Sequence, residues 1–170
     1  MKAWQVTEWC EPEGMHWNEI EVPKPKPGQV LIRVRASALN FFDILQVQGK
    51  YQVKPPFPFT PGAEVSGEVE AVGEGVTHLK VGDRAAYASN PPGSYSEARV
   101  MPAKTVCKLP DGISFETGAA MMLKGMTAGY LLKRTLPVEG LQKGDRLEKI
   151  GLVAIEWEED PRGSGRKLAT

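Results

Sequence analysis

The segment "QVLIRVRASALNFFDILQVQGKY", residues 29–51, decides the fold because its apolar period changes in the middle. Residues 29–39 alternate, with Val30, Ile32 and Val34 on one face, and this period of two predicts a β-strand. From Asn40 onward the apolar residues recur at helical spacing. We therefore expect a strand that leads directly into a short helix, with Asn40 near the helix cap.

Turn-forming residues divide the rest of the first 110 positions into short apolar runs. The chain has 18 glycines and 14 prolines, which is typical of a β-rich protein with many turns. Further strands are expected at 2–7, 15–23, 64–76, 81–88, 93–103 and 105–110, the first two forming a pair. Gly67 interrupts a strand pattern and predicts a bulge or a close backbone approach. The predicted fold is mainly β with helices (α+β), built on a partly closed barrel.

The pattern becomes helical after Ser114, which is a suitable N-cap. We expect Gly125 to split this region into two helices. Residues 147–160, "LEKIGLVAIEWEED", place Ile150, Val153, Ala154 and Trp157 on one helix face, and residues 165–170 suggest a fragment of strand.

Composition excludes several classes of function. The 170-residue chain has 21 basic and 21 acidic residues, so no charge excess favours nucleic acid or an anionic membrane. It has no apolar run of membrane-spanning length and no secretory leader, and we expect a cytoplasmic protein. Cys10 and Cys107 are expected to be free thiols.

Three polar side chains of the opening segment are candidates for a site. Asn40 fits a helix cap, and Asp43 fits the first helical turn, where a carboxylate faces free amides. The Tyr51 phenol can donate a hydrogen bond to a carbonyl oxygen that gains charge during reduction, or it can simply pack at a loop.

Four stretches, in order, resemble one known family. They are "PGQVLIRVRASALNFFDILQVQGKY", "PFTPGAEVSGEVEAVGEGVTHLKVGDRAAY", "GSYSEARVMPA" and "LPDGISFETGAAMMLKGMTAGYLL". Together they resemble the zinc-independent quinone oxidoreductase branch of the medium-chain dehydrogenase/reductase superfamily. The resemblance implies a GroES-like catalytic domain over residues 1–135. It also implies that residues 136–170 are the truncated start of a Rossmann nucleotide-binding domain.

The resemblance also implies roles for individual residues. Asn40 would lie beside the substrate and the nicotinamide, and Thr127 would approach the nicotinamide carboxamide of NADP(H). Gly151 is what remains of the glycine-rich phosphate loop. Lys124, considered from the residue alone, either assists phosphate or substrate binding or is an exposed, solvated lysine. No metal is expected, because the cysteine and histidine of zinc-dependent members are absent at "ALNFFD" and at Gly62-Ala63-Glu64.

Two functions follow from these expectations. The first is an NADPH-dependent quinone or enone reductase with Asn40 and Tyr51 as catalytic residues, acting on a small carbonyl or quinone substrate and incompetent as an isolated chain. The second is a non-catalytic remnant that acts as an interaction or oligomerisation module, since apolar helix faces near residues 115–132 would be uncovered. A small-molecule-binding barrel unrelated to redox chemistry is the third possibility.

Overall fold

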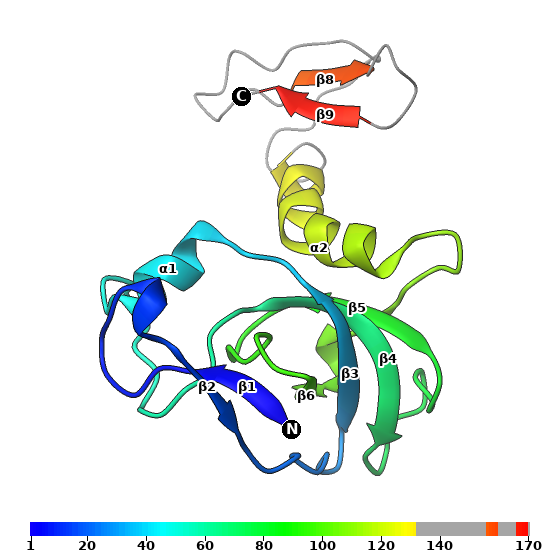
Figure 1. The fold of residues 1–170 in the computed structure, drawn as a ribbon. Helices are drawn as coiled ribbons and strands as arrows, with labels where there is room; N and C mark the ends of the chain where they lie inside the picture. Colours follow the sequence, from blue (N-terminus) through cyan, green and yellow to red (C-terminus); the bar gives the residue numbers. More distant parts are fainter. Residues whose placement is uncertain (132–155, 160–165, 170) are drawn as a thin grey trace. The chain divides into compact units, whose positions relative to one another are not determined.

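The alternating run at residues 29–37 forms the strand β3 (Gln29–Ser37) of a five-stranded antiparallel sheet with the order β6-β3-β4-β5-β7. The other strands are β4 (Glu64–Val72), β5 (Arg84–Ala88), β6 (Ala98–Pro102) and β7 (Cys107–Lys108). The computed structural model describes residues 1–131, 156–159 and 166–169. Figure 1 shows the sheet curling around an interior, which is the partly closed barrel that the sequence predicts.

The barrel interior is filled by alternate side chains of these strands. Val30 and Ile32 are fully buried there, and Arg33 and Arg35, on the opposite face, form ion pairs with glutamates of β4. The core cluster consists of Val30, Ile32, Val65, Val69, Leu79, Ala85, Tyr87, Met101, Ala103 and Val106.

Gly67 lies at an irregularity of the β3–β4 pairing. It pairs with Val34, next to a register shift between Val34 and Ala36. A Cβ at this position would lie 2.0 Å from the carbonyl oxygen of Arg33, so only glycine fits. The bulge or close approach predicted from the sequence is confirmed.

A second, smaller sheet extends the barrel. Strand β1 (Lys2–Gln5) pairs with β2 (His16–Glu19) in antiparallel register, as the sequence predicts. Two isolated bridges, Ala3 to Ser96 and Val6 to Phe59, attach the N-terminal segment to the rest of the unit.

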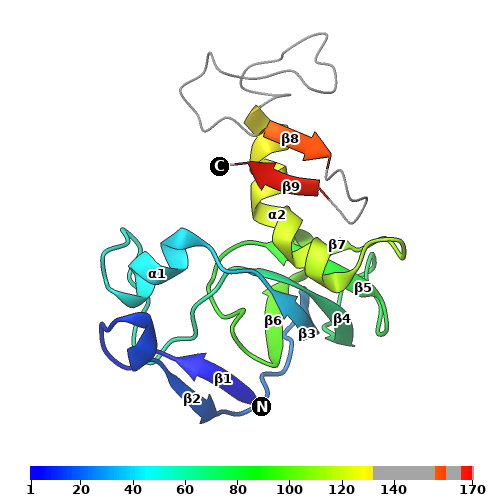
Figure 2. The ribbon, with the colours of Figure 1, turned by 45° about the horizontal axis from the view of Figure 1, so that its top comes forward.

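Four helical segments lie within the described residues 1–131, and two of them, α1 (Phe41–Val47) and α2 (Phe115–Tyr130), are α-helices. The short 3-10 segments are η1 (Pro12–Gly14) and η2 (Ala103–Thr105). Ser114 caps α2, because its Oγ accepts a hydrogen bond from the Thr117 amide at 3.1 Å. Figure 2 shows α2 beside β4, β5 and β7, and the Ser66 hydroxyl on β4 bonds to the Phe115 carbonyl.

Two expectations for the C-terminal part are corrected. Helix α2 runs unbroken through Gly125, since one glycine inside a helix costs only about 1 kcal/mol and the cap and barrel contacts offset it. Residues 156–159 are not helical. They form the strand β8 (Glu156–Glu159), antiparallel to β9 (Arg166–Ala169), in a register that sets Glu158 opposite Lys167 and so favours a strand pair.

The chain divides into two compact units, Met1–Ala128 and Gly129–Thr170. Strands β8 and β9 belong to the second unit. The domain division after residue 135, and the Rossmann origin of the residues beyond it, stay predictions. The rest of the predicted helix at 147–160 lies outside the described residues.

Candidate functional site

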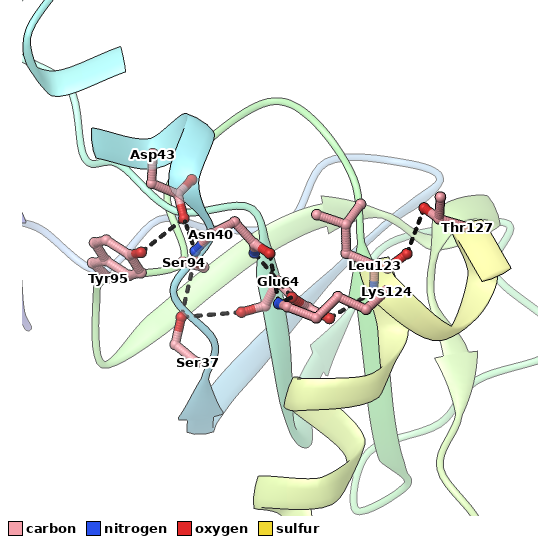
Figure 3. A network of polar contacts seen from close by, with 9 residues as sticks. All are labelled: Ser37, Asn40, Asp43, Glu64, Ser94, Tyr95, Leu123, Lys124 and Thr127. Atoms are coloured by element: carbon pink, nitrogen blue, oxygen red, sulfur yellow. Dashed lines mark hydrogen bonds and ion pairs between the residues drawn. The ribbon is translucent and has the colours of Figure 1, made fainter. Parts of the chain in front are cut away.

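The first turn of α1 orients the side chain of Asn40. Asn40 is the N-cap residue, as predicted, and its backbone N–H donates to Asp43 Oδ2 at 2.9 Å. The Asn40 side chain is directed away from the helix, toward Glu64 on β4 and Lys124 on α2 (Figure 3). The sequence motif thus places a carboxamide between three different elements.

Asn40, Glu64 and Lys124 form a polar cluster at the edge of the barrel. Asn40 Nδ2 donates to Glu64 Oε2 at 2.9 Å, and Lys124 Nζ donates to Asn40 Oδ1 at 2.8 Å. The ammonium also lies 3.7 Å from Glu64 Oε2. Because an ammonium only donates and an ionised carboxylate only accepts, these two partners fix which way the amide faces.

The cluster combines a buried carboxylate with a cation that reaches solvent. Glu64 is 0% exposed and Asn40 is buried, whereas the Lys124 side chain is 58% exposed. The second oxygen of Glu64 accepts a hydrogen bond from the Leu123 backbone amide at 2.6 Å. Burying a carboxylate costs less free energy when its oxygens accept hydrogen bonds, and both oxygens of Glu64 have donors.

A second buried carboxylate lies behind the first. Asp43 Oδ2 accepts a hydrogen bond from the Tyr95 hydroxyl at 2.8 Å as well as from Asn40. Burial raises the pKa of Asp43, its two hydrogen bonds lower it, and the nearby Glu64 carboxylate raises it further. The pKa of the Tyr95 phenol is also raised, chiefly by burial and next by the charge of Asp43.

The other residues expected at the site have separate surroundings. The ring of Tyr51 lies 5.6 Å from that of Phe42, and no hydrogen bond within residues 1–131 joins its hydroxyl to Asn40. The Thr127 hydroxyl donates to the Leu123 carbonyl at 2.7 Å, one turn earlier in α2. Gly151 lies outside the described residues.

Sequence reasoning assigned no site role to Glu64 and did not consider Tyr95. "GAEVSG" sets the glutamate among small and apolar residues, a pattern that signals a buried acid. Its partners could not be named, because Asn40 is 24 residues away and Leu123 is 59 residues away. Tyr95 carries no comparable signal in the sequence.

Other candidate features lie apart from this cluster. A surface groove of about 420 Å³ is lined by parts of 1–23, 55–60 and 91–99, and none of Asn40, Glu64 and Lys124 lines it. In the part of the chain that the structure describes, no three His, Cys, Asp or Glu side chains are grouped as metal ligands would be.

Comparison with known proteins places this arrangement in a family. The profile of the family "Alcohol dehydrogenase GroES-like domain" matches residues 26–111, half of the chain, from the proline segment before β3 to just after β7. The chain belongs to this GroES-like domain family. The expected GroES-like domain and the expected relationship to quinone oxidoreductases of the medium-chain dehydrogenase/reductase superfamily are confirmed.

Quinone oxidoreductases are similar to the chain in both sequence and structure. That of Pseudomonas aeruginosa is 41% identical over 162 residues, which cover 92% of this chain and 49% of that protein. The crystal structure of the Pseudomonas syringae enzyme matches with a TM-score of 0.77 and 44% identity, covering 81% of this chain and 42% of that one. The Escherichia coli enzyme complexed with NADPH matches with a TM-score of 0.78 and 34% identity over the same shares.

The GroES-like chain spans about half the length of the curated relatives it matches. The similarity therefore concerns the N-terminal half of those enzymes. Within the described residues, no helix combines the length and the apolar character needed to cross a bilayer.

Proposed function

We propose that the chain carries the carbonyl-binding half of an NADPH-dependent quinone or enone oxidoreductase that works without zinc. The observation that carries this proposal is the Lys124 ammonium, held 2.8 Å from Asn40 Oδ1 above the buried Glu64 carboxylate. The similarity to quinone oxidoreductases supports the same reaction class.

The cluster has the chemistry that carbonyl reduction requires. The carbonyl oxygen gains negative charge as it is reduced, and donors that are oriented in advance stabilise that charge. Lys124 has three N–H groups, of which the described residues engage one in a hydrogen bond, and Asn40 Nδ2 has a second N–H besides the one given to Glu64. Both residues can therefore donate to a substrate oxygen, and Tyr51 is proposed as a further donor.

The cofactor proposed for this site is NADP(H), which supplies the hydride when bound. An exposed ammonium, a carboxamide and a hydroxyl, on Lys124, Asn40 and Thr127, fit the polar end of a nicotinamide. Gly151 is proposed to contact the phosphates. In this role the three side chains orient the ring and keep its carboxamide bonded.

Binding of a quinone by the purified chain tests the proposal. A tetramethyl-substituted benzoquinone suits this, because it has no free ring position for addition of Cys10 or Cys107. We expect the NMR signals of Asn40 and Lys124 to shift on titration, and Lys124→Gln to weaken binding about tenfold. Lys104→Gln, which changes another exposed lysine of the same unit, is the matched control. Equal affinity in wild type and Lys124→Gln, with no shift at either residue, would refute the proposal.

Turnover by the chain alone is a separate question. Because the 170 residues span about half the length of their relatives, we expect this polypeptide by itself to bind NADPH more weakly than micromolar and to reduce quinones negligibly. A micromolar affinity in a fluorescence titration contradicts this expectation while leaving the carbonyl site untouched.

A second candidate function is self-association. Met121 and Met126 on α2 are 44% and 49% exposed, and apolar side chains on one helix favour contact with another protein surface. Sedimentation velocity tests self-association. We expect the wild type to form a dimer or larger species and the double variant Met121→Gln, Met126→Gln to be monomeric. A monomeric wild type rules this candidate out.

A further inference from the structure

The Glu64 carboxylate reaches into the middle of α2. Glu64 Oε1 accepts from the Leu123 amide at 2.6 Å, and Leu123 lies eight residues after the first residue of the helix. A mid-helix amide ordinarily donates to the carbonyl four residues earlier. The Leu123 amide therefore has an acceptor outside the helix, supplied by a strand of the barrel. The Leu123 carbonyl in turn accepts a hydrogen bond from the Thr127 hydroxyl, one turn later in α2.

The same carboxylate also controls the amide of Asn40. Glu64 Oε2 takes the Nδ2–H of Asn40, and this turns Asn40 Oδ1 toward the ammonium of Lys124 (Figure 3). Lys124 follows Leu123 in the chain. Glu64 therefore acts on Lys124 in two ways. Its Oε1 binds the backbone amide of the residue before Lys124, and its Oε2 orients the Asn40 side chain that accepts from the Lys124 ammonium.

Burial of Glu64 calls for an explanation beyond packing. Among the residues that the structure describes, the one cation paired with it lies 3.7 Å away and is mostly exposed, so this ion pair offsets little of the cost of burying the charge. An apolar residue would dock α2 on the barrel without that cost. What an apolar residue cannot do is accept two hydrogen bonds in opposite directions.

We propose that Glu64 is a positioning residue that fixes Lys124 and Asn40 in the geometry that binds substrate. The inference rests on the proposed function for the statement that these two side chains meet the substrate. The positioning itself is a property of the chain and can be measured without substrate.

The variant Glu64→Gln separates the two halves of this role. Its side-chain carbonyl can still accept from the Leu123 amide, but its NH2 group faces the NH2 group of Asn40 instead of accepting from it. We expect the Leu123 amide to keep its hydrogen-exchange protection within about threefold. The ¹⁵N signal of the Lys124 ammonium, visible when hydrogen bonding slows exchange with water, should disappear. Glu68→Gln, on the exposed face of the same strand, should keep both signals.

Three results bear on the proposal. A Lys124 signal that persists unchanged in a folded Glu64→Gln protein overturns it, since the ammonium is then held by something else. Joint loss of both signals in Glu64→Gln with the fold intact also overturns it, because Glu64 would only dock the helix. If Glu64→Gln does not fold, the wild type decides: an unprotected Leu123 amide or a Lys124 ammonium in fast exchange refutes the positioning, and slow exchange of both supports it.

The test of the Glu64 positioning role and the test of the carbonyl site can fail separately. Loss of the Lys124 signal in Glu64→Gln, without quinone binding by the wild type, supports the positioning and refutes the carbonyl site. Quinone binding of equal strength in wild type and Glu64→Gln supports the site and refutes the positioning.

Discussion

Replacing Gly67 with alanine should destabilise the barrel more than any ordinary glycine substitution. The new Cβ would lie 2.0 Å from the Arg33 carbonyl oxygen and 3.0 Å from Ile32 Cγ2. Carbon and oxygen tolerate about 3.3 Å, so β3 and β4 must separate by more than about 1 Å. That movement stretches the ladder hydrogen bonds on either side of the bulge.

The expected loss of stability in Gly67→Ala is the sum of an overpacking cost and a hydrogen-bond cost, less a small entropic gain. Overpacking of a tight site costs about 1–3 kcal/mol, and each weakened ladder bond adds about 1 kcal/mol. The lower entropy of an unfolded chain with alanine returns about 0.5 kcal/mol. We expect the free energy of unfolding to fall by about 3 kcal/mol, a large part of the 5–15 kcal/mol typical of a domain.

Urea denaturation followed by circular dichroism and tryptophan fluorescence measures this loss. Gly112→Ala is the matched control, because its Cβ meets no atom within 4 Å and its φ is not positive. It should change the free energy of unfolding by less than about 1 kcal/mol. If the free energy of unfolding of Gly67→Ala lies within about 0.5 kcal/mol of the wild-type value, the prediction is refuted, since β3 and β4 could then separate at no cost.

Two further predictions concern titrating groups. Because the folded-state pKa of Asp43 is raised, the group stabilises the fold below its unfolded pKa of about 3.9, and this contribution is lost as pH rises through the folded value. The stability of Asp43→Asn relative to wild type should therefore rise as the pH increases above about 4, and a difference that stays constant in urea titrations at successive pH values contradicts the prediction. Burial and the charges of Glu8 and Glu11 raise the pKa of the Cys10 thiol, whereas Cys107 is exposed, so a disulfide reagent should modify Cys107 first. A fast phase that survives in Cys107→Ser would show the opposite order.

The sequence predicted those features that depend on nearby residues. Alternation defined β3, Asn40 and Ser114 were recognised as caps, and Gly67 was recognised as a close approach, because each is governed by local periodicity or local backbone geometry. The barrel was predicted from the succession of short strands separated by turn residues, and the resemblance to the family implied the same fold.

The predictions that proved wrong, and the site residue that was not recognised, have physical explanations. Gly125 was expected to break the helix, but the tertiary contacts of α2 outweigh the low helix propensity of glycine, which costs about 1 kcal/mol. The helical pattern that included Trp157 competed with a strand pairing to β9 that single-segment periodicity cannot detect. Glu64 was missed as the centre of the cluster because its partners on α1 and α2 come together only in the folded chain.

The bond between Glu64 and the Leu123 amide sets a lower limit on the smallest autonomous fragment. The family match ends at residue 111, before α2 begins. A polypeptide that ends at residue 111 would lack α2. The Glu64 carboxylate, which is 0% exposed in the intact chain, would then lose the Leu123 amide that donates to one of its oxygens. A fragment intended for expression on its own should therefore extend through residue 128, where the first unit ends.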